Sequence, residues 1–132
     1  MTINGKQKGK RGELELVRKL KEYGYDGARR TAQYCGNTGD AADITGALDG
    51  VHIECKRVEK LNIYDAVNQA KRDAKDGLLP TVFHRKNHCE WLVTMPLDAW
   101  MRLYRDYEPD VPFADLEEGY GKGMDQTSQG TD

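Results

Sequence analysis

The chain has 132 residues, of which 38% are hydrophobic and 32% are charged, so we expect one domain with a modest core. No apolar run approaches the roughly 18 residues that cross a bilayer, and the first residues lack the apolar segment of a secretory signal. Three widely spaced cysteines (Cys35, Cys55 and Cys89) favour reduced thiols in a cytoplasmic protein. These counts argue against a membrane protein, a disulfide scaffold and a multidomain enzyme.

Charge is distributed unevenly along the chain. Residues 1–75 hold 15 Lys and Arg against 11 Asp and Glu, whereas residues 76–132 hold 5 against 11. A basic first half suits a polyanionic partner, most simply nucleic acid, although a solvated charged face would give the same pattern.

The first third of the chain predicts an arm, a helix and a strand. Residues 1–8 are expected to form a flexible basic arm. Residues 9–23 carry apolar side chains at helical spacing and precede a glycine, so they predict a helix. A short strand is expected near residues 28–31. The inner face of the helix would carry Leu16, Val17, Leu20 and Tyr23.

Two strand-like runs, 43–48 and 51–57, are separated by Asp49-Gly50, a dipeptide typical of a two-residue hairpin turn. In that register Asp43 would lie opposite Lys56, and Thr45 opposite Glu54. Side chains alternate between the two faces of a strand, so these four residues would share one face. The other face would carry Ile44, Ile53 and Cys55.

The second half of the chain predicts two helices, 62–76 and 96–107, with two antiparallel strands, 81–84 and 90–94, between them. The inner faces of these helices would carry Ile63, Ala66, Val67, Ala70 and Ala74, and Leu97, Trp100, Met101 and Tyr104. The order of elements predicts an α/β domain over residues 1–107, with a mixed central sheet flanked by helices. Residues 108–132 carry seven acids and one base and are expected to be an acidic, mobile tail.

The shared face of the predicted hairpin has the composition of a metal site. Asp43 and Glu54 would place carboxylate oxygens together, and oxygen ligands suit Mg²⁺ or Mn²⁺. A divalent ion there could polarise a phosphodiester, with Lys56 orienting water or stabilising developing charge. The backbone carbonyl of Cys55 is a further candidate ligand. An ordinary cross-strand salt bridge between Asp43 and Lys56 is the structural alternative.

Several segments together resemble one nuclease family. The array Asp43-x(10)-Glu54-Cys55-Lys56 resembles the PD-(D/E)xK nuclease signature. KGKRGELELVRKL is similar to the opening helix of archaeal-type Holliday-junction resolvases and their phage relatives, and VHIECKR to their central strand. NQAKRDA places Gln69 where many related nucleases carry a helix residue near the site. The resemblance covers roughly residues 8–104.

The resemblance implies a restriction-endonuclease-like fold and extends the predicted site. It adds Glu13 to the catalytic and metal-binding residues and leaves Glu15 on the surface. Ala42 stands where the signature has proline, and the preceding loop lacks a clear equivalent of a serine that some resolvases carry. The hydroxyls nearby are Thr31 and Thr38, and Asp40 is a competing acid.

The function expected from these residues is a metal-dependent endonuclease that resolves Holliday junctions by paired phosphodiester hydrolysis. Its catalytic residues would be Glu13, Asp43, Glu54, Lys56 and Gln69, with Mg²⁺ or Mn²⁺ and no small-molecule cofactor. Two symmetric cuts imply a homodimer on a four-way junction. The residues expected to contact phosphate are Lys6, Lys8, Lys10, Arg11, Arg29, Arg30, Arg57 and Lys60.

Three other functions remain open on the residues alone, the weakest of them an interaction protein that binds no nucleic acid, which only the acidic tail suggests. A nuclease of the same fold could act on flaps, forks or duplex DNA. A non-catalytic DNA-binding module would keep the same basic residues and use the carboxylates structurally. Cleavage of a synthetic junction, compared with matched duplex, distinguishes these possibilities.

Overall fold

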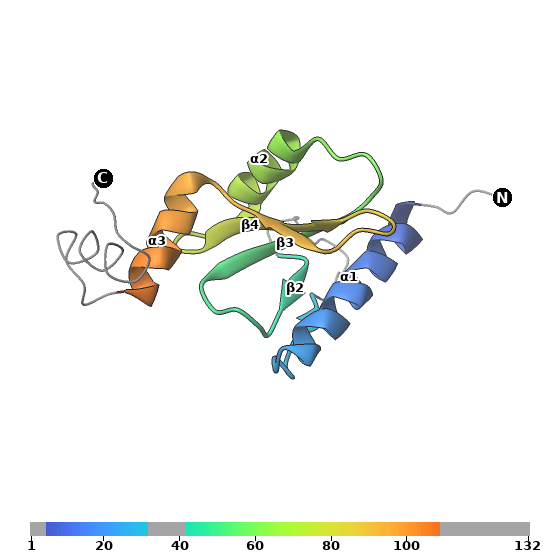
Figure 1. The fold of residues 1–132 in the computed structure, drawn as a ribbon, viewed down its shortest axis with the longest axis horizontal. Helices are drawn as coiled ribbons and strands as arrows, with labels where there is room; N and C mark the ends of the chain where they lie inside the picture. The colour runs from blue at the N-terminus through green and yellow to red at the C-terminus, as the bar shows by residue number, and fades with distance from the viewer. Residues whose placement is uncertain (1–4, 32–41, 109–132) are drawn as a thin grey trace, which may run out of the picture. The chain divides into compact units, whose positions relative to one another are not determined.

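The computed structural model describes residues 5–31 and 42–108. The elements follow the predicted order of one helix, three strands, a helix, two strands and a helix (Figure 1). Their bounds are α1 (Gly5–Glu22), β1 (Arg29–Arg30), β2 (Ile44–Thr45), β3 (Val51–Arg57), α2 (Ile63–Asp73), β4 (Leu79–Arg85), β5 (Leu92–Thr94) and α3 (Leu97–Tyr107). The α/β class with a mixed sheet is therefore confirmed.

The five strands form one sheet in the order β1-β2-β3-β4-β5. Strands β3 and β4 are parallel and are joined through α2, whereas every other neighbouring pair is antiparallel. Parallel neighbours need a crossover connection, which α2 provides. The strand at the centre of the sheet, β3, is therefore the one that carries the predicted Glu54 and Lys56.

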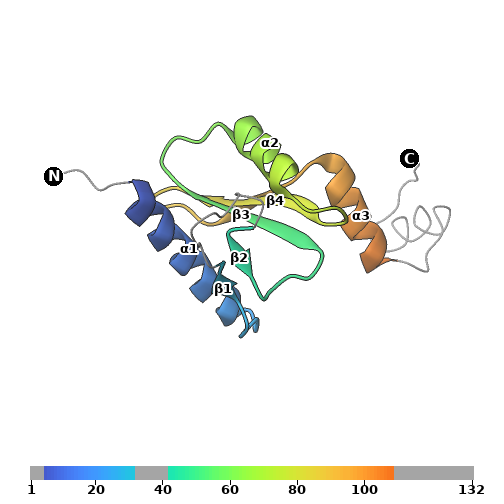
Figure 2. The ribbon, with the colours of Figure 1, turned by 180° about the vertical axis from the view of Figure 1, so that it is seen from behind.

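Helices α1 and α2 cover opposite faces of the sheet (Figures 1 and 2). The face toward α1 is the larger core, and the face toward α2 is smaller. The first core contains Leu16, Val17, Leu20, Ala28, Ile44, Ile53 and Phe83. The second contains Ala66, Ala70 and Val82. Because β3 is covered on both faces, the polar side chains of His52 and Glu54, which point toward α2, are buried along with the apolar ones.

The hairpin between β2 and β3 differs from the predicted two-residue turn. Ile44 pairs with Ile53, and five residues, 46–50, connect the strands. The connection uses left-handed backbone at Gly46 (φ 80°), Leu48 (φ 53°) and Gly50 (φ 86°). The register is shifted by two residues, which preserves the face of every side chain. It moves Asp43 from opposite Lys56 to beside Glu54.

The N-terminal helix is longer than predicted. Residues 5–8, expected in a flexible arm, form the first turn of α1, consistent with the good helix propensity of lysine and glutamine. Residues 1–4 lie outside the described ranges. At the other end, Tyr23 follows the last helical residue and is 73% exposed, so the prediction that it packs inward is wrong.

The chain divides into two units between Ala99 and Trp100, within α3, and each is described by itself. Residues 1–99 contain all five strands. In α3 the small Ala99 is buried, whereas Leu97, Trp100 and Met101 are exposed, contrary to the predicted inner face. The Trp100 and Tyr104 rings stack with centroids 5.1 Å apart. From residue 109 onward, the predicted acidic tail falls outside the described residues.

Within the described part of the chain, no helix is both long enough and apolar enough to cross a membrane.

Candidate active site

The predicted site residues come from four separate elements of the first unit. Glu13 lies on α1, Asp43 immediately before β2, Glu54 and Lys56 on β3, and Gln69 on α2. Hydrogen bonds link the side chains of Glu54, Lys56 and Gln69. Asp43 is bonded to the backbone of β3, and Glu13 pairs with Arg30 of β1. The assembly depends on the crossover, because α2 returns over the face of β3 that carries Glu54 and Lys56.

Asp43 is fixed against the edge of β3 at the point where β2 begins. Its backbone N–H donates to the carbonyl of Ile53 at 2.9 Å, and its Oδ2 accepts the backbone N–H of Cys55 at 2.8 Å. In a strand the N–H and carbonyl of one residue point to the same side. The carbonyl of Cys55 therefore faces the side occupied by Asp43, where it remains a candidate metal ligand.

The carboxyl group of Asp43 lies in a negative environment. Burial is the largest cause that raises its pKa, to about 7, and the charge of Glu54 is the next. Glu13 also raises this pKa, whereas the Cys55 N–H and the Lys56 ammonium lower it. The positive charge of Lys56 is therefore insufficient to offset the negative charge of the neighbouring carboxylates. A bound cation would stabilise such an environment.

Glu54 is buried, with 3% of its surface exposed, and both of its oxygens have partners. Oε1 lies 3.0 Å from Nε2 of His52, and Oε2 accepts from Nε2 of Gln69 at 2.9 Å. Because a carboxylate only accepts hydrogen bonds, Nε2 of His52 acts as the donor. His52 is not among the predicted site residues, and its spacing of two residues from Glu54, which puts both side chains on one face of β3, is the signal that could have identified it.

Lys56 is held by Gln69. Its Nζ donates to Oε1 of Gln69 at 2.9 Å, so the amide links the ammonium to Glu54. Lys56 and Asp43, both of which the structure describes, do not form the cross-strand salt bridge that was the alternative interpretation. The shift in hairpin register explains the difference. Gln69 is thus placed within the predicted site.

Two glutamates of α1 form ion pairs with the sheet. Glu13 accepts from Nε of Arg30 at 2.7 Å, and Glu15 accepts from Nε of Arg57 at 2.9 Å. Glu15 also pairs with Arg85, so its predicted role as a surface residue is wrong: it is partly buried and ties α1 to β3 and β4.

The other predicted phosphate contacts are distributed over the surface. Lys10, Arg11, Arg29 and Lys60 are exposed, and Arg29 donates to the carbonyl of Gly27 at 3.2 Å. Lys6 and Lys8 belong to the first turns of α1, and their side chains lie outside the described parts. Their nucleic-acid contacts remain predictions.

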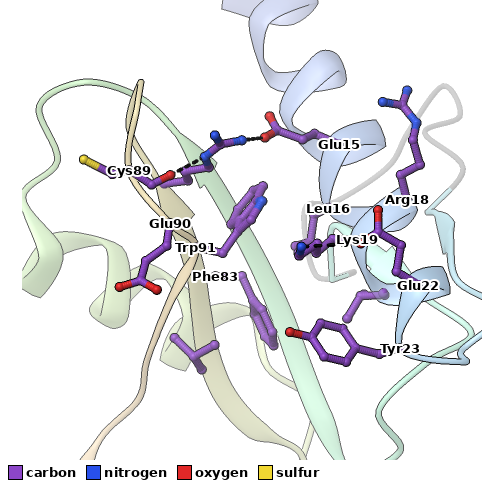
Figure 3. Close-up of a pocket in the computed structure, with 13 residues that line it drawn as sticks. Glu15, Leu16, Arg18, Lys19, Glu22, Tyr23, Phe83, Cys89, Glu90 and Trp91 are labelled. Atoms are coloured by element: carbon purple, nitrogen blue, oxygen red, sulfur yellow. Dashed lines mark hydrogen bonds and ion pairs between the residues drawn. The ribbon is translucent and has the colours of Figure 1, made fainter.

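A large cavity of about 650 Å³ lies between α1 and strands β4 and β5, away from these carboxylates. Figure 3 shows Leu16 of α1 and Tyr23, which follows α1, on one side and Phe83 and Trp91 on the other. Its lining includes none of the predicted catalytic residues. A second cavity, of about 470 Å³, is lined by both Lys56 and Gln69. This cavity therefore adjoins the candidate site at Lys56 and Gln69, and its lining does not include Glu13, Asp43 or Glu54.

The donor set fits a divalent cation in charge and ligand type. Asp43, Glu54 and Glu13 supply oxygen donors, and the pKa of Asp43 is raised mainly by burial and then by the charges of Glu54 and Glu13. Among the side chains that the structure describes, no three His, Cys, Asp or Glu groups are arranged to hold one ion together. The fit therefore rests on the carboxylates with a backbone carbonyl.

Comparison of the chain with protein-family models, curated proteins and solved structures finds no significant match.

Proposed function

We propose that this protein is a metal-dependent endonuclease that resolves Holliday junctions by paired phosphodiester hydrolysis, with a restriction-endonuclease-like fold. The observation that carries the proposal is the environment of Asp43. This carboxyl is partly buried beside Glu54, its pKa is raised to about 7, and Lys56 lies on the same face of the sheet. The resemblance to PD-(D/E)xK nucleases supports the same assignment.

Each residue of the proposed site has its own role in the reaction. Asp43, Glu54 and the carbonyl of Cys55 would hold Mg²⁺ or Mn²⁺, with Glu13 supporting a second ion or the water. A bound divalent ion supplies a polarised phosphodiester oxygen and a water of lowered pKa. Lys56 orients the attacking water or stabilises charge that develops on the phosphate.

Gln69 contributes by positioning. Its amide accepts from Lys56 and donates to Glu54, so both catalytic side chains are held by one group on α2. The orientation of this amide is fixed, because its oxygen meets an ammonium and its nitrogen meets a carboxylate. The two side chains therefore keep a defined spacing before substrate arrives.

The proposed substrate and assembly follow from the reaction. A four-way junction has two symmetric scissile strands, so we propose a twofold homodimer that acts in the cytoplasm. Light scattering is expected to report about twice the 14.9 kDa of one chain. A monomer that nicks only one strand would favour a simpler nuclease of the same fold.

The test is cleavage of labelled DNA by the purified full chain. A synthetic immobile junction, a matched duplex, a flap and a fork are incubated with Mg²⁺ and, separately, with EDTA. The proposal predicts paired cuts in the junction that require the metal. Preferential cutting of the flap, fork or duplex would show that the protein is a nuclease with another substrate and not a junction resolvase. Tight DNA binding without cutting under any condition would indicate a binding module.

A further inference from the structure

The cavity beside Lys56 and Gln69 continues along one face of α2. It has a volume of about 470 Å³, and its α2 lining includes Asp65, Asn68 and Arg72. Residues three or four positions apart lie on the same face of a helix, so these side chains and Gln69 form one stripe. Lys56 of β3 also lines the cavity, where its Nζ donates to Gln69. The cavity is therefore a polar groove whose lining includes the proposed catalytic lysine.

The charges in this groove are uneven along its length. Asp65 lies in the first turn of α2, and Arg72 lies in the last turn, with Lys56 and Gln69 between them in the lining. A phosphate is repelled by the Asp65 end and attracted by the Arg72 end. Asn68 and Arg72 are exposed and are both residue types that commonly donate hydrogen bonds to DNA phosphates.

We propose that this groove binds a backbone phosphate of the DNA strand beside the cleaved bond, with Arg72 as its principal cation and Asn68 as a hydrogen-bond donor. The inference rests on the proposed function and extends it to a substrate contact outside the catalytic residues. It also gives α2 a second role, since the helix that positions Gln69 would orient the strand.

The neighbouring residue supplies a matched control. Lys71 is exposed and lies beside Arg72 in the last turn of α2, but it does not line the groove. Arg72→Glu and Lys71→Glu change the net charge of the chain equally. The long-range effect of charge is the same in both variants. A difference in their affinity for DNA therefore shows that a side chain in the groove contacts the DNA.

The experiment measures binding of a fluorescent four-way junction to the full chain carrying Glu54→Gln, over a range of salt concentrations. Arg72→Glu is expected to raise the Kd about tenfold and to reduce the salt slope by about one, while Lys71→Glu stays within about threefold. Arg72→Lys, which keeps the charge, should recover most of the affinity. In the otherwise unchanged protein, Arg72→Glu should slow junction cleavage at low substrate more than Lys71→Glu does.

Equal binding by the Arg72→Glu and Lys71→Glu variants would refute phosphate binding in the groove while leaving the proposed function intact. Failure of the parent protein to bind junction DNA would instead overturn both. Thermal unfolding checks that each variant is folded. Should a charge reversal disturb folding, the same comparison is made with Arg72→Gln and Lys71→Gln, and equal affinities there would again overturn the proposal.

Discussion

Nε2 of His52 lies 3.0 Å from Oε1 of Glu54, and both side chains are buried in the centre of β3. A buried carboxylate is costly unless hydrogen bonds stabilise it. With Gln69 on the other oxygen, Glu54 is held from two directions before any ligand binds. The position of this carboxylate is therefore set by a residue that the nuclease signature does not include.

Replacing His52 should weaken metal binding. His52→Leu removes the donor to Glu54 and is expected to lower Mn²⁺ affinity, measured by calorimetry, by about 10- to 100-fold, as is typical when a partner of a metal ligand is lost. His52→Gln retains an N–H donor and should recover most of that affinity. Thr81→Val removes a buried hydroxyl from β4 without touching Glu54, so it should lower stability alone. Unchanged Mn²⁺ affinity in a folded His52→Leu variant would refute this role.

Lys56→Ala should reduce catalysis far more than stability. The ammonium is expected to act on charge that develops during the reaction, and removal of such a group costs about 10²- to 10³-fold in rate. Lys75→Ala, an exposed lysine that follows α2, is the control for loss of a positive charge. Cleavage rate and melting temperature are measured together. A large fall in melting temperature with the rate retained would mean that Lys56 is structural.

The raised pKa of Asp43 predicts how stability depends on pH. Its pKa is about 7 in the folded protein against 3.8 ordinarily, so the folded state binds the extra proton between these values. The stabilisation is complete at low pH and is lost as pH rises through about 7, and the pKa difference corresponds to at most about 4 kcal/mol. Without divalent ions, Asp43→Asn should therefore be more stable than the parent at pH 8 and nearly equal to it at pH 4.

The control for this titration is Asp49→Asn in the exposed turn. Urea unfolding at both pH values gives the free energies of unfolding. Added Mg²⁺ should stabilise the parent protein at pH 8 and the Asp43→Asn variant much less. A constant difference between parent and variant from pH 4 to pH 8 would show that Asp43 has an ordinary carboxyl pKa.

Two glycines of α1 should respond in opposite ways to alanine. A Cβ at Gly12 would lie 2.5 Å from the Cβ of Arg57, whereas a Cβ at Gly9 meets nothing within 4 Å. Alanine favours a helix over glycine by about 1 kcal/mol, so Gly9→Ala should stabilise the fold by up to that amount. Gly12→Ala should destabilise it by about 1–3 kcal/mol, because α1 must move away from β3. Equal stabilisation by both variants in thermal unfolding would contradict the close packing of α1 on β3.

Much of the fold was predictable because local signals and tertiary packing agree. Apolar residues at helical spacing in α1 and α2 do face the sheet, with Leu16 and Ala70 among the buried side chains. Helix α3 forms as predicted, but its predicted inner face is wrong, because spacing alone does not show which face of an amphipathic helix is covered. Only the small Ala99 is buried there, and the larger neighbours are exposed.

The sequence predicted which face of the sheet the site residues occupy better than it predicted the contacts between their side chains. Alternation along β3 correctly placed Glu54 and Lys56 with Asp43, since a register error of two residues leaves the faces unchanged. The turn itself was missed because Leu48 adopts a left-handed conformation that is uncommon for its residue type. The ion pairs of Glu13 and Glu15 depend on how α1 crosses the sheet, which short sequence patterns do not encode.

The most direct measurement is cleavage of a four-way junction in Mg²⁺ by the Glu54→Gln variant, alongside the parent protein. The amide keeps the shape of the side chain and removes the charge expected to hold the metal. Junction affinity should be largely retained, because it comes mainly from basic residues, while the cleavage rate should fall by about 10³-fold or more. A variant that binds the junction and retains more than about a tenth of the parent rate would contradict the assignment of the active site.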